Sequence, residues 1–255
     1  MKYFILADIH GYYDQMLVAL NKAGYDRTNR DHFLISLGDA FDRGPKPREV
    51  MGYLLNTYPD RRALILGNHE DLMEQAICRR AFQPHDDSNG AIETAKLITG
   101  AHNEFDSLIK LRDDCLYNDY ISSCQDYFET KNSIFVHGWI PTETINRKVK
   151  AIDDWRNASK DNWRSARWIN GMLAWYNGAF IPNKTIYCGH WHCTWGKCYI
   201  DHTSKEFPNP YSTNPAHRVL DWSPFQKEGI VALDACTALS GIVNCVVIED
   251  EQINK

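Results

Sequence analysis

The sequence lacks an apolar run long enough to cross a membrane. Its most apolar late stretch, residues 229–250, is interrupted by Asp234 and Asn244, so no bilayer-spanning helix is expected there. The apolar run at the start gives way to Asp8 after a few residues, which is too short for the apolar core of a secretory signal peptide. These absences predict a protein that acts without a membrane.

Cysteines are sparse, and positive charge is not in excess. The 255-residue chain has eight cysteines and no C-x-x-C pair, which fits neither a disulfide scaffold nor a common zinc motif. We therefore expect free thiols and a cytoplasmic location. The formal net charge of −5 argues against a nucleic-acid-binding surface spread over the whole fold, so no nucleic-acid partner is expected.

What the sequence does contain is a repeated ending to its short apolar runs. Five runs rich in Ile, Leu, Val, Phe and Tyr each lead into glycine and a polar side chain. Their length and composition are typical of buried strands rather than helices. The polar side chains that follow them are Asp8, His10, Asp39, Asp42, Arg43, Asn68, His69, His137 and His190.

Helical patterns separate the early strands. Residues 12–24 and 45–59 carry apolar side chains at helical spacing, the first stopping at glycine and the second before proline. Alternating strands and helices predict an α/β protein. Residues 71–125 are expected to form a helical insertion, and the proline-rich residues 198–228 a lid loop. We see no dividing linker, so we predict one domain over residues 1–255.

Three further segments have weaker patterns. Residues 127–136 are expected to form a hairpin that turns near Lys131. The tryptophan-rich residues 141–180 are expected to be helices near the site. Residues 229–250 are interpreted as two strands around a glycine-containing turn.

The strand-end side chains suit divalent metal ions. If the strands lie in one α/β sheet, their carboxyl ends share the side where ligands bind. Carboxylate, imidazole and amide donors favour ions of the manganese, iron or zinc type over calcium. The candidate ligands outnumber the four of a typical single zinc site, and one carboxylate can bridge two ions. Two ions are therefore expected on Asp8, His10, Asp39, Asn68, His137 and His190.

The order of the motifs adds a resemblance. "DIHG", "GDAFDRG", "GNHE", "HG" and "GH" follow one another between residues 8 and 190. They resemble the motif blocks of the phosphoprotein-phosphatase family of calcineurin-like, binuclear metallophosphoesterases. The chain is most similar to bacterial and bacteriophage members, which include lambda-type serine/threonine phosphatases and diadenosine tetraphosphatases. The resemblance implies two packed mixed β-sheets flanked by helices, an α/β/β/α sandwich.

The resemblance also implies a role for each motif residue. Asp8 and His10 would hold one ion with Asp39, which would bridge to a second ion completed by Asn68, His137 and His190. Arg43 and Asn68 would bind the substrate phosphate, His69 would donate a proton, and Asp42 would orient His69. A hydroxide between the two ions would attack the phosphorus. The ions are expected to be Mn²⁺, with iron or zinc as alternatives.

The motif blocks assign no role to several other candidate residues. The family commonly supplies a second phosphate-binding arginine before its last histidine, and we favour Arg167 over Arg164. His192 follows "GHW" and is expected to lie outside the ligand set. The tryptophans are expected to be mostly core residues.

These features predict a metal-dependent phosphatase acting on phosphomonoesters, with phosphoserine or phosphothreonine as the first expectation. The alternative substrate is a dinucleoside polyphosphate or another nucleotide, for which Trp191, Trp195 and Tyr199 could provide a base platform. A more distant alternative is a non-catalytic metal-binding interaction module. The sequence does not specify an oligomeric state.

Overall fold

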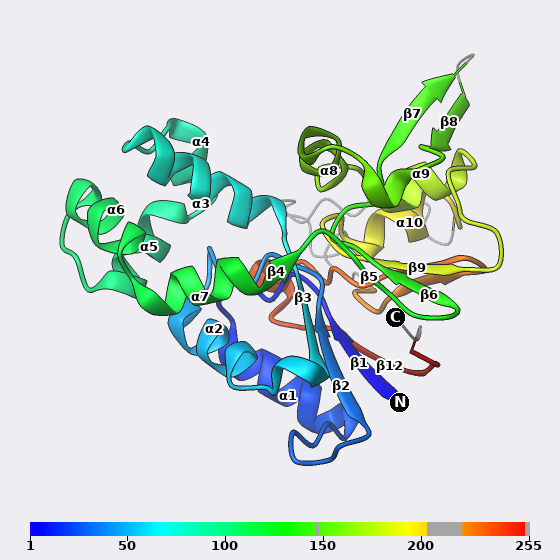
Figure 1. Cartoon of the computed structure of the whole chain (residues 1–255), viewed down its shortest axis with the longest axis horizontal. Helices are drawn as coiled ribbons and strands as arrows, with labels where there is room; N and C mark the ends of the chain where they lie inside the picture. Colours follow the sequence, from blue (N-terminus) through cyan, green and yellow to red (C-terminus); the bar gives the residue numbers. More distant parts are fainter. Residues whose placement is uncertain (146–147, 203–220, 253–255) are drawn as a thin grey trace.

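The computed structural model describes residues 1–145, 148–202 and 221–252. Two five-stranded mixed sheets form its centre (Figure 1). In the first sheet β1 to β4 are parallel neighbours and β12 runs antiparallel to β1. Its order is β12 (Cys245–Glu249), β1 (Lys2–Leu6), β2 (His32–Ser36), β3 (Arg62–Ile65) and β4 (Cys124–Gln125).

The second sheet has parallel strands at its centre and antiparallel strands at both edges. The antiparallel edge pair β5–β6 confirms the hairpin expected near Lys131. The order of this sheet is β10 (Phe225–Lys227), β11 (Ile230–Ala232), β9 (Thr185–Cys188), β6 (Ser133–Phe135) and β5 (Phe128–Glu129).

Apolar side chains join the two sheets face to face. Tyr3 and Ile5 of β1 pack in one cluster with Phe135 of β6. The alternate residues Phe4 and Leu6 belong to a different cluster on the outer face of the first sheet, because successive side chains of a strand point to opposite faces. Burial on both faces explains why these strands are almost continuously apolar.

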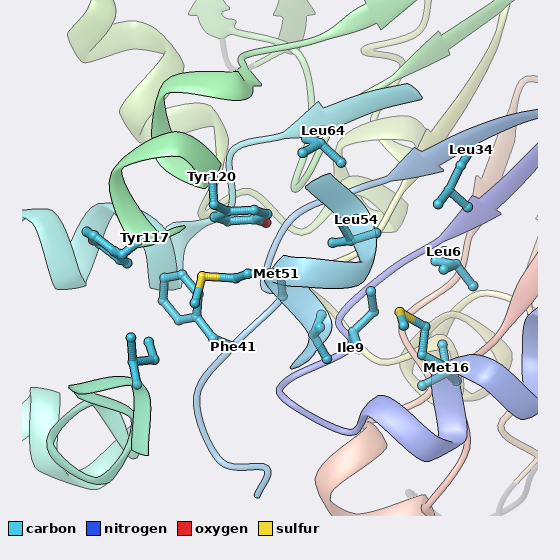
Figure 2. Packing of buried hydrophobic residues seen from close by; sticks show 14 of the residues in the cluster. Leu6, Ile9, Met16, Leu34, Phe41, Met51, Leu54, Leu64, Tyr117 and Tyr120 are labelled. Atoms are coloured by element: carbon cyan, nitrogen blue, oxygen red, sulfur yellow. The ribbon is translucent and has the colours of Figure 1, made fainter. Parts of the chain in front are cut away.

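Helices cover the outer face of each sheet and so complete four layers. On the first sheet lie α1 (Tyr13–Ala23) and α2 (Pro47–Leu55). On the second lie α8 (Lys160–Ala166) and α9 (Gly171–Tyr176), with α10 (Cys193–Tyr199) beside them. This α/β/β/α arrangement confirms the expected fold class. Figure 2 shows the packing of the first sheet against its helices at Leu6, Leu34, Met16, Met51 and Leu54.

A run of five helices follows β3 and extends to one side of the sheets (Figure 1, cyan to green). Tyr117 and Tyr120 of the last of these helices pack beside Phe41 and so tie the run to the loop after β2 (Figure 2). The helices are α3 (Asn68–Arg79), α4 (Pro84–Ser88), α5 (Ala91–Thr99), α6 (Glu104–Arg112) and α7 (Cys115–Ser123).

Three expectations meet a different or partial outcome. Residues 141–180 contain helices, but also an antiparallel hairpin of β7 (Thr142–Ile145) and β8 (Lys148–Ala151), which projects away from the sheets (Figure 1). The two C-terminal strands are no hairpin, because β11 and β12 belong to different sheets and the short α11 (Thr237–Ser240) stands between them. Most of the expected lid loop, 203–220, lies outside the described residues.

No helix in the described part of the chain is both long enough and apolar enough to span a bilayer.

Candidate metal centre

The predicted site residues follow strands of both sheets. Asp8, Asp39 and Asn68 follow β1, β2 and β3, whereas His137 and His190 follow β6 and β9. The strand ends of the site therefore come from both of the sheets that the resemblance implied, and not from one. Two sheets, each with parallel central strands, bring their carboxyl ends to a common edge, where ligands bind in α/β folds.

The backbone at this edge is unusual. Several non-glycine site residues have left-handed backbone conformations, each of which costs roughly 1–3 kcal/mol. Asp and His tolerate this conformation better than most residues, and the surrounding structure holds them in it. Their φ angles are 50° for Asp8, 51° for His10 and Asp39, 68° for Asp42 and Arg43, and 65° for His190.

The Asp39 carboxylate lies between two groups of histidines. Its Oδ2 is 3.8 Å from Nε2 of both His10 and His69. Its Oδ1 is 3.4 Å from Nε2 of His137. Two triads could each hold an ion, because their donor atoms lie within 4.8 Å of one another: His10, Asp39 and His69, and Asp39, His137 and His190.

Backbone carbonyls orient two of the histidines. Nδ1 of His10 lies 3.0 Å from the Phe41 oxygen, and Nδ1 of His137 lies 2.7 Å from the Leu37 oxygen. A proton on Nδ1 then donates to the carbonyl and leaves Nε2 as the atom that can bind a metal. Nε2 of His137 is 2.7 Å from Oδ1 of Asn68, which brings an imidazole and an amide oxygen to one point.

The ionisation of the site histidines suits metal binding in all but one case. Burial lowers the pKa of His10, of His137 and of His190, the last to about 3. Neutral imidazole is the form that binds metals. The pKa of His69 is raised: burial lowers it, but the nearby Asp39 and Asp42 carboxylates outweigh that effect.

Asp8 is buried near two other carboxylates, those of Asp39 and Asp234. Its two oxygens accept hydrogen bonds of 3.0 Å from the backbone N–H of His190. Burial raises the pKa of Asp8 well above its usual value, and the Asp234 and Asp39 carboxylates raise it further. Carboxylates crowded in a dry site favour a bound cation. Asp8 belongs to neither triad, but its charge fits an ion beside them.

Asp234 was not among the predicted site residues. It is buried directly after β11, in the same strand-end position as the predicted ligands. The apolar run "GIVAL" before it is the signal that could have identified it. Nε2 of His192 lies 3.8 Å from Oδ2 of Asp234, and His192 is in neither triad; its expected place outside the ligand set stays a prediction.

His69, Asp42 and Arg43 form a connected group. Nδ1 of His69 lies 2.6 Å from Oδ2 of Asp42, which is fully buried. Arg43 places Nη1 2.9 Å from Nε2 of His10 and Nη2 2.9 Å from Nε2 of His69. The guanidinium therefore lies beside both a candidate ligand and the candidate proton donor.

Glu70 joins the loops that carry the candidate ligands after β2 and β3, a role that the sequence did not suggest although Glu70 is part of "GNHE". Its buried carboxylate accepts hydrogen bonds of 2.9–3.0 Å from the backbone N–H groups of Asp39, Ala40 and Gly67. A side chain at Gly67 would overlap with Oδ1 of Asp39. Close approach of the loops after β2 and β3 thus depends on glycine at one position and a carboxylate at the other.

The two candidate second arginines differ in environment. Arg167 is buried and donates from Nη1 to Asp71 and from Nη2 to Asp126. The exposed Arg164 lies 3.4 Å from Asp161 of the same helix. Two carboxylates thus already pair with the Arg167 guanidinium, and its role as a phosphate clamp stays a prediction.

Known proteins with similar sequences include several bis(5′-nucleosyl)-tetraphosphatases, matched over short segments. The chain is 39% identical over 77 residues to an asymmetrical bis(5′-nucleosyl)-tetraphosphatase, PrpE, of Bacillus velezensis, which covers 27% of the chain and 30% of that protein. It is 34% identical over 70 residues to a symmetrical bis(5′-nucleosyl)-tetraphosphatase of Buchnera aphidicola, and this match covers 28% of the chain and 24% of that relative. The matches thus span less than a third of either relative.

A solved structure and a family model extend the similarity over more of the chain. The crystal structure of a candidate diadenosine tetraphosphatase covers 97% of this chain and 89% of its own, with a TM-score of 0.52 and 15% identity, which supports the fold. The model of the calcineurin-like phosphoesterases matches residues 1–211. With the strand-end motifs and the two triads, this match places the chain in the calcineurin-like phosphoesterase family.

Proposed function

We propose that this chain is a binuclear metal-dependent phosphohydrolase that cleaves a phosphoanhydride bond of dinucleoside polyphosphates of the diadenosine tetraphosphate type. The observation that carries the proposal is the position of Asp39, whose two oxygens face different histidine groups in a buried site. A carboxylate shared in this way can join two ions about 3.5–4 Å apart.

The donor set fits two divalent ions. His10 and Asp39 would hold one with Asp8, and Asn68, His137 and His190 would hold the other with Asp39. Such ions would neutralise negative charge and would lower the pKa of water enough for hydroxide to be available near neutral pH. Nitrogen and oxygen donors suit manganese, zinc and iron. We expect Mn²⁺, and zinc stays an alternative because a matched yeast relative is a zinc-dependent endopolyphosphatase.

The remaining side chains would act on the substrate itself. The Arg43 guanidinium can offer a planar pair of donors to phosphate oxygens. Its partners in the structure are Nε2 of His10 and Nε2 of His69, the atoms that would face the ions and the substrate in this proposal. His69 can protonate the leaving oxygen because Asp42 holds its other ring nitrogen.

The relatives favour the nucleotide alternative over the first expectation of a phosphoserine or phosphothreonine substrate. The tetraphosphatase matches come from two bacterial lineages and two enzyme types. Structures of protein-tyrosine phosphatases also share the fold, at 15% identity and a TM-score of 0.51, so the fold by itself does not select a substrate. We also propose a cytoplasmic location, because all eight cysteines are free in the structure.

The test is a substrate panel with added Mn²⁺: diadenosine tetraphosphate, a phosphoserine peptide and p-nitrophenyl phosphate. We expect the highest kcat/KM for the dinucleotide, and complete loss of all three activities on chelation. A higher kcat/KM for the phosphopeptide would restore the protein phosphatase reading. Activity that survives exhaustive chelation, with metal analysis confirming its removal, would contradict the metal mechanism itself.

A further inference from the structure

Two tryptophans at the metal centre differ from the rest. The chain has eight tryptophans, and those of the cores, such as Trp139 and Trp163, are 1% and 3% exposed. Trp168 and Trp191 are 47% and 39% exposed and are the only tryptophans among the exposed large apolar residues of the described chain. The expectation was that most tryptophans belong to the core, and these two are exceptions to it.

Both exposed rings contact the same candidate ligand. The Trp168 ring centroid lies 5.7 Å from that of His190, with an interplanar angle of 86°. The Trp191 centroid lies 6.4 Å from His190 at 78°. The two indoles come from separate segments, one between α8 and α9 and the other between β9 and α10. Two independent segments thus place an exposed aromatic ring beside one corner of the metal centre.

Two further aromatic rings follow Trp191: the half-buried Trp195 and the exposed Tyr199. Trp195 lies 6.2 Å from Trp191, and Tyr199 lies 5.1 Å from Trp195, between ring centroids. Isolated exposed apolar residues are ordinary and need no explanation. A series of aromatic rings that begins at a catalytic edge is different, because large exposed apolar surface next to a site marks ligand contact.

We infer that Trp168 and Trp191 form a nucleobase platform, on which a base of the substrate stacks while its phosphates lie at the metal centre. The inference rests on the proposed function and adds the part of the site that recognises the nucleoside. Every base offers a flat π-face, and stacking on aromatic side chains is tolerant of base identity. The platform would therefore bind nucleotides in preference to bare phosphate chains, with weak discrimination between bases.

The position of the platform favours a nucleotide over a phosphopeptide. A nucleobase is joined to its phosphates through one sugar, so it lies no farther from the metal centre than the sugar and the phosphate chain can reach. Both indoles meet this requirement, because each contacts the imidazole of His190. A peptide would instead extend along a surface and need backbone hydrogen-bonding partners.

Binding can test the platform without catalysis. Titration calorimetry with the manganese-loaded protein would compare adenosine 5′-(β,γ-methylene)triphosphate with methylenediphosphonate, which has no base. Trp168→Ala and Trp191→Ala should each weaken nucleotide binding roughly 5- to 150-fold and change diphosphonate binding less than about twofold. The Trp→Phe variants keep a ring and should recover most of the lost affinity. Phe105→Ala removes a 64% exposed aromatic residue from α6 and should change neither.

Three results would overturn the platform: equal affinity of the unaltered protein for the two probes, unchanged nucleotide binding in both alanine variants, or equal weakening of both probes. A phosphoserine peptide that loses as much affinity as the nucleotide would also overturn it. Hydrolysis of diadenosine tetraphosphate, measured in parallel, separates the two proposals. Tight, tryptophan-dependent nucleotide binding without hydrolysis would leave the platform in place and reject the proposed substrate.

Discussion

At the scale of single residues, Asp39 and His69 illustrate how one side chain can serve two environments. Asp39 faces different histidines with its two oxygens. His69 gives Nδ1 to Asp42 and turns Nε2 towards Asp39 and Arg43. The second geometry is compatible with a proton donor and also with a metal ligand, since His69 is part of one triad. Substitutions can separate these readings.

Asp39→Asn should reduce bound metal at both positions, because the amide keeps one oxygen and loses the charge that both ions share. Asp8→Asn should reduce it at one position only. Mutation of a residue that only orients a metal ligand lowers metal affinity or activity about 10- to 100-fold. We therefore expect Asp39→Asn to lower kcat/KM by roughly 100-fold or more. Metal analysis after gel filtration measures occupancy. One ion per chain in a fully active preparation would contradict the shared site.

His69→Asn should keep both ions but lose activity, and the loss should increase with the pKa of the leaving group. An alkoxide needs a proton, and general acids contribute about 100- to 10,000-fold. The leaving group of a polyphosphate is itself a phosphate, with a pKa of about 6, so it can leave without being protonated by a general acid. We expect a large loss for alkyl phosphates and a small one for p-nitrophenyl phosphate and diadenosine tetraphosphate. Equal losses at full occupancy would exclude the proton donor, and loss of metal would make His69 a ligand.

At the scale of elements, the helices after β3 reach back to the metal centre. Asn89, just before α5, lies 3.4 Å from Nη2 of Arg43. Gly90, the N-cap of α5, has φ of +87°, and a Cβ there would lie 2.9 Å from the Arg43 backbone nitrogen. The start of α5 thus packs directly on the residue that we expect to bind phosphate.

Gly90→Ala should therefore impair substrate binding more than stability alone explains. Gly100, at the other end of α5, is the matched control: its φ is +67°, and a Cβ there would meet nothing within 4 Å. Both alanines strain the backbone by roughly 1–2 kcal/mol, but only the one at position 90 displaces Arg43. We expect a higher KM for Gly90→Ala and near-normal kinetics for Gly100→Ala, with similar losses in Tm. Identical kinetics would show that α5 does not position Arg43.

At the scale of the whole molecule, the apolar clusters are shared rather than separate. The inter-sheet cluster takes side chains from β1, β2 and β3 of one sheet and from β6, β9 and β11 of the other. The outer clusters use the opposite faces of the same strands. Unfolding of either sheet would expose apolar surface on the other sheet, so the layers are expected to unfold cooperatively.

We therefore expect residues 1–255 to unfold as one domain. Thermal or urea unfolding, followed by far-ultraviolet circular dichroism and by tryptophan fluorescence, should give coincident transitions with one midpoint. Most tryptophans lie on the side of the second sheet, so fluorescence reports chiefly on that layer. A fluorescence midpoint clearly separated from the dichroism midpoint would indicate two independently folding units.

The sequence by itself determined which residues stand at the strand ends, and the order of its motifs implied the fold class through a family resemblance. The runs before Asp8, Asp39 and Asn68 are buried strands, and "GDAFDRG" and "GNHE" are short motifs whose members are adjacent in the chain. Local patterns suffice for such features, because side-chain alternation, glycine and strand length act over a few residues. Four of the six predicted metal ligands lie in the two triads, and Asp8 and Asn68 lie beside them.

Only the tertiary structure decided which distant residues meet. Arg167 pairs with Asp71, 96 positions away, and Asn89 reaches Arg43 across 46. The convergence of two sheets at one edge and the exposure of Trp168 and Trp191 are likewise properties of packing. No local pattern encodes these contacts, because they follow from how layers of strands and helices bury their apolar faces.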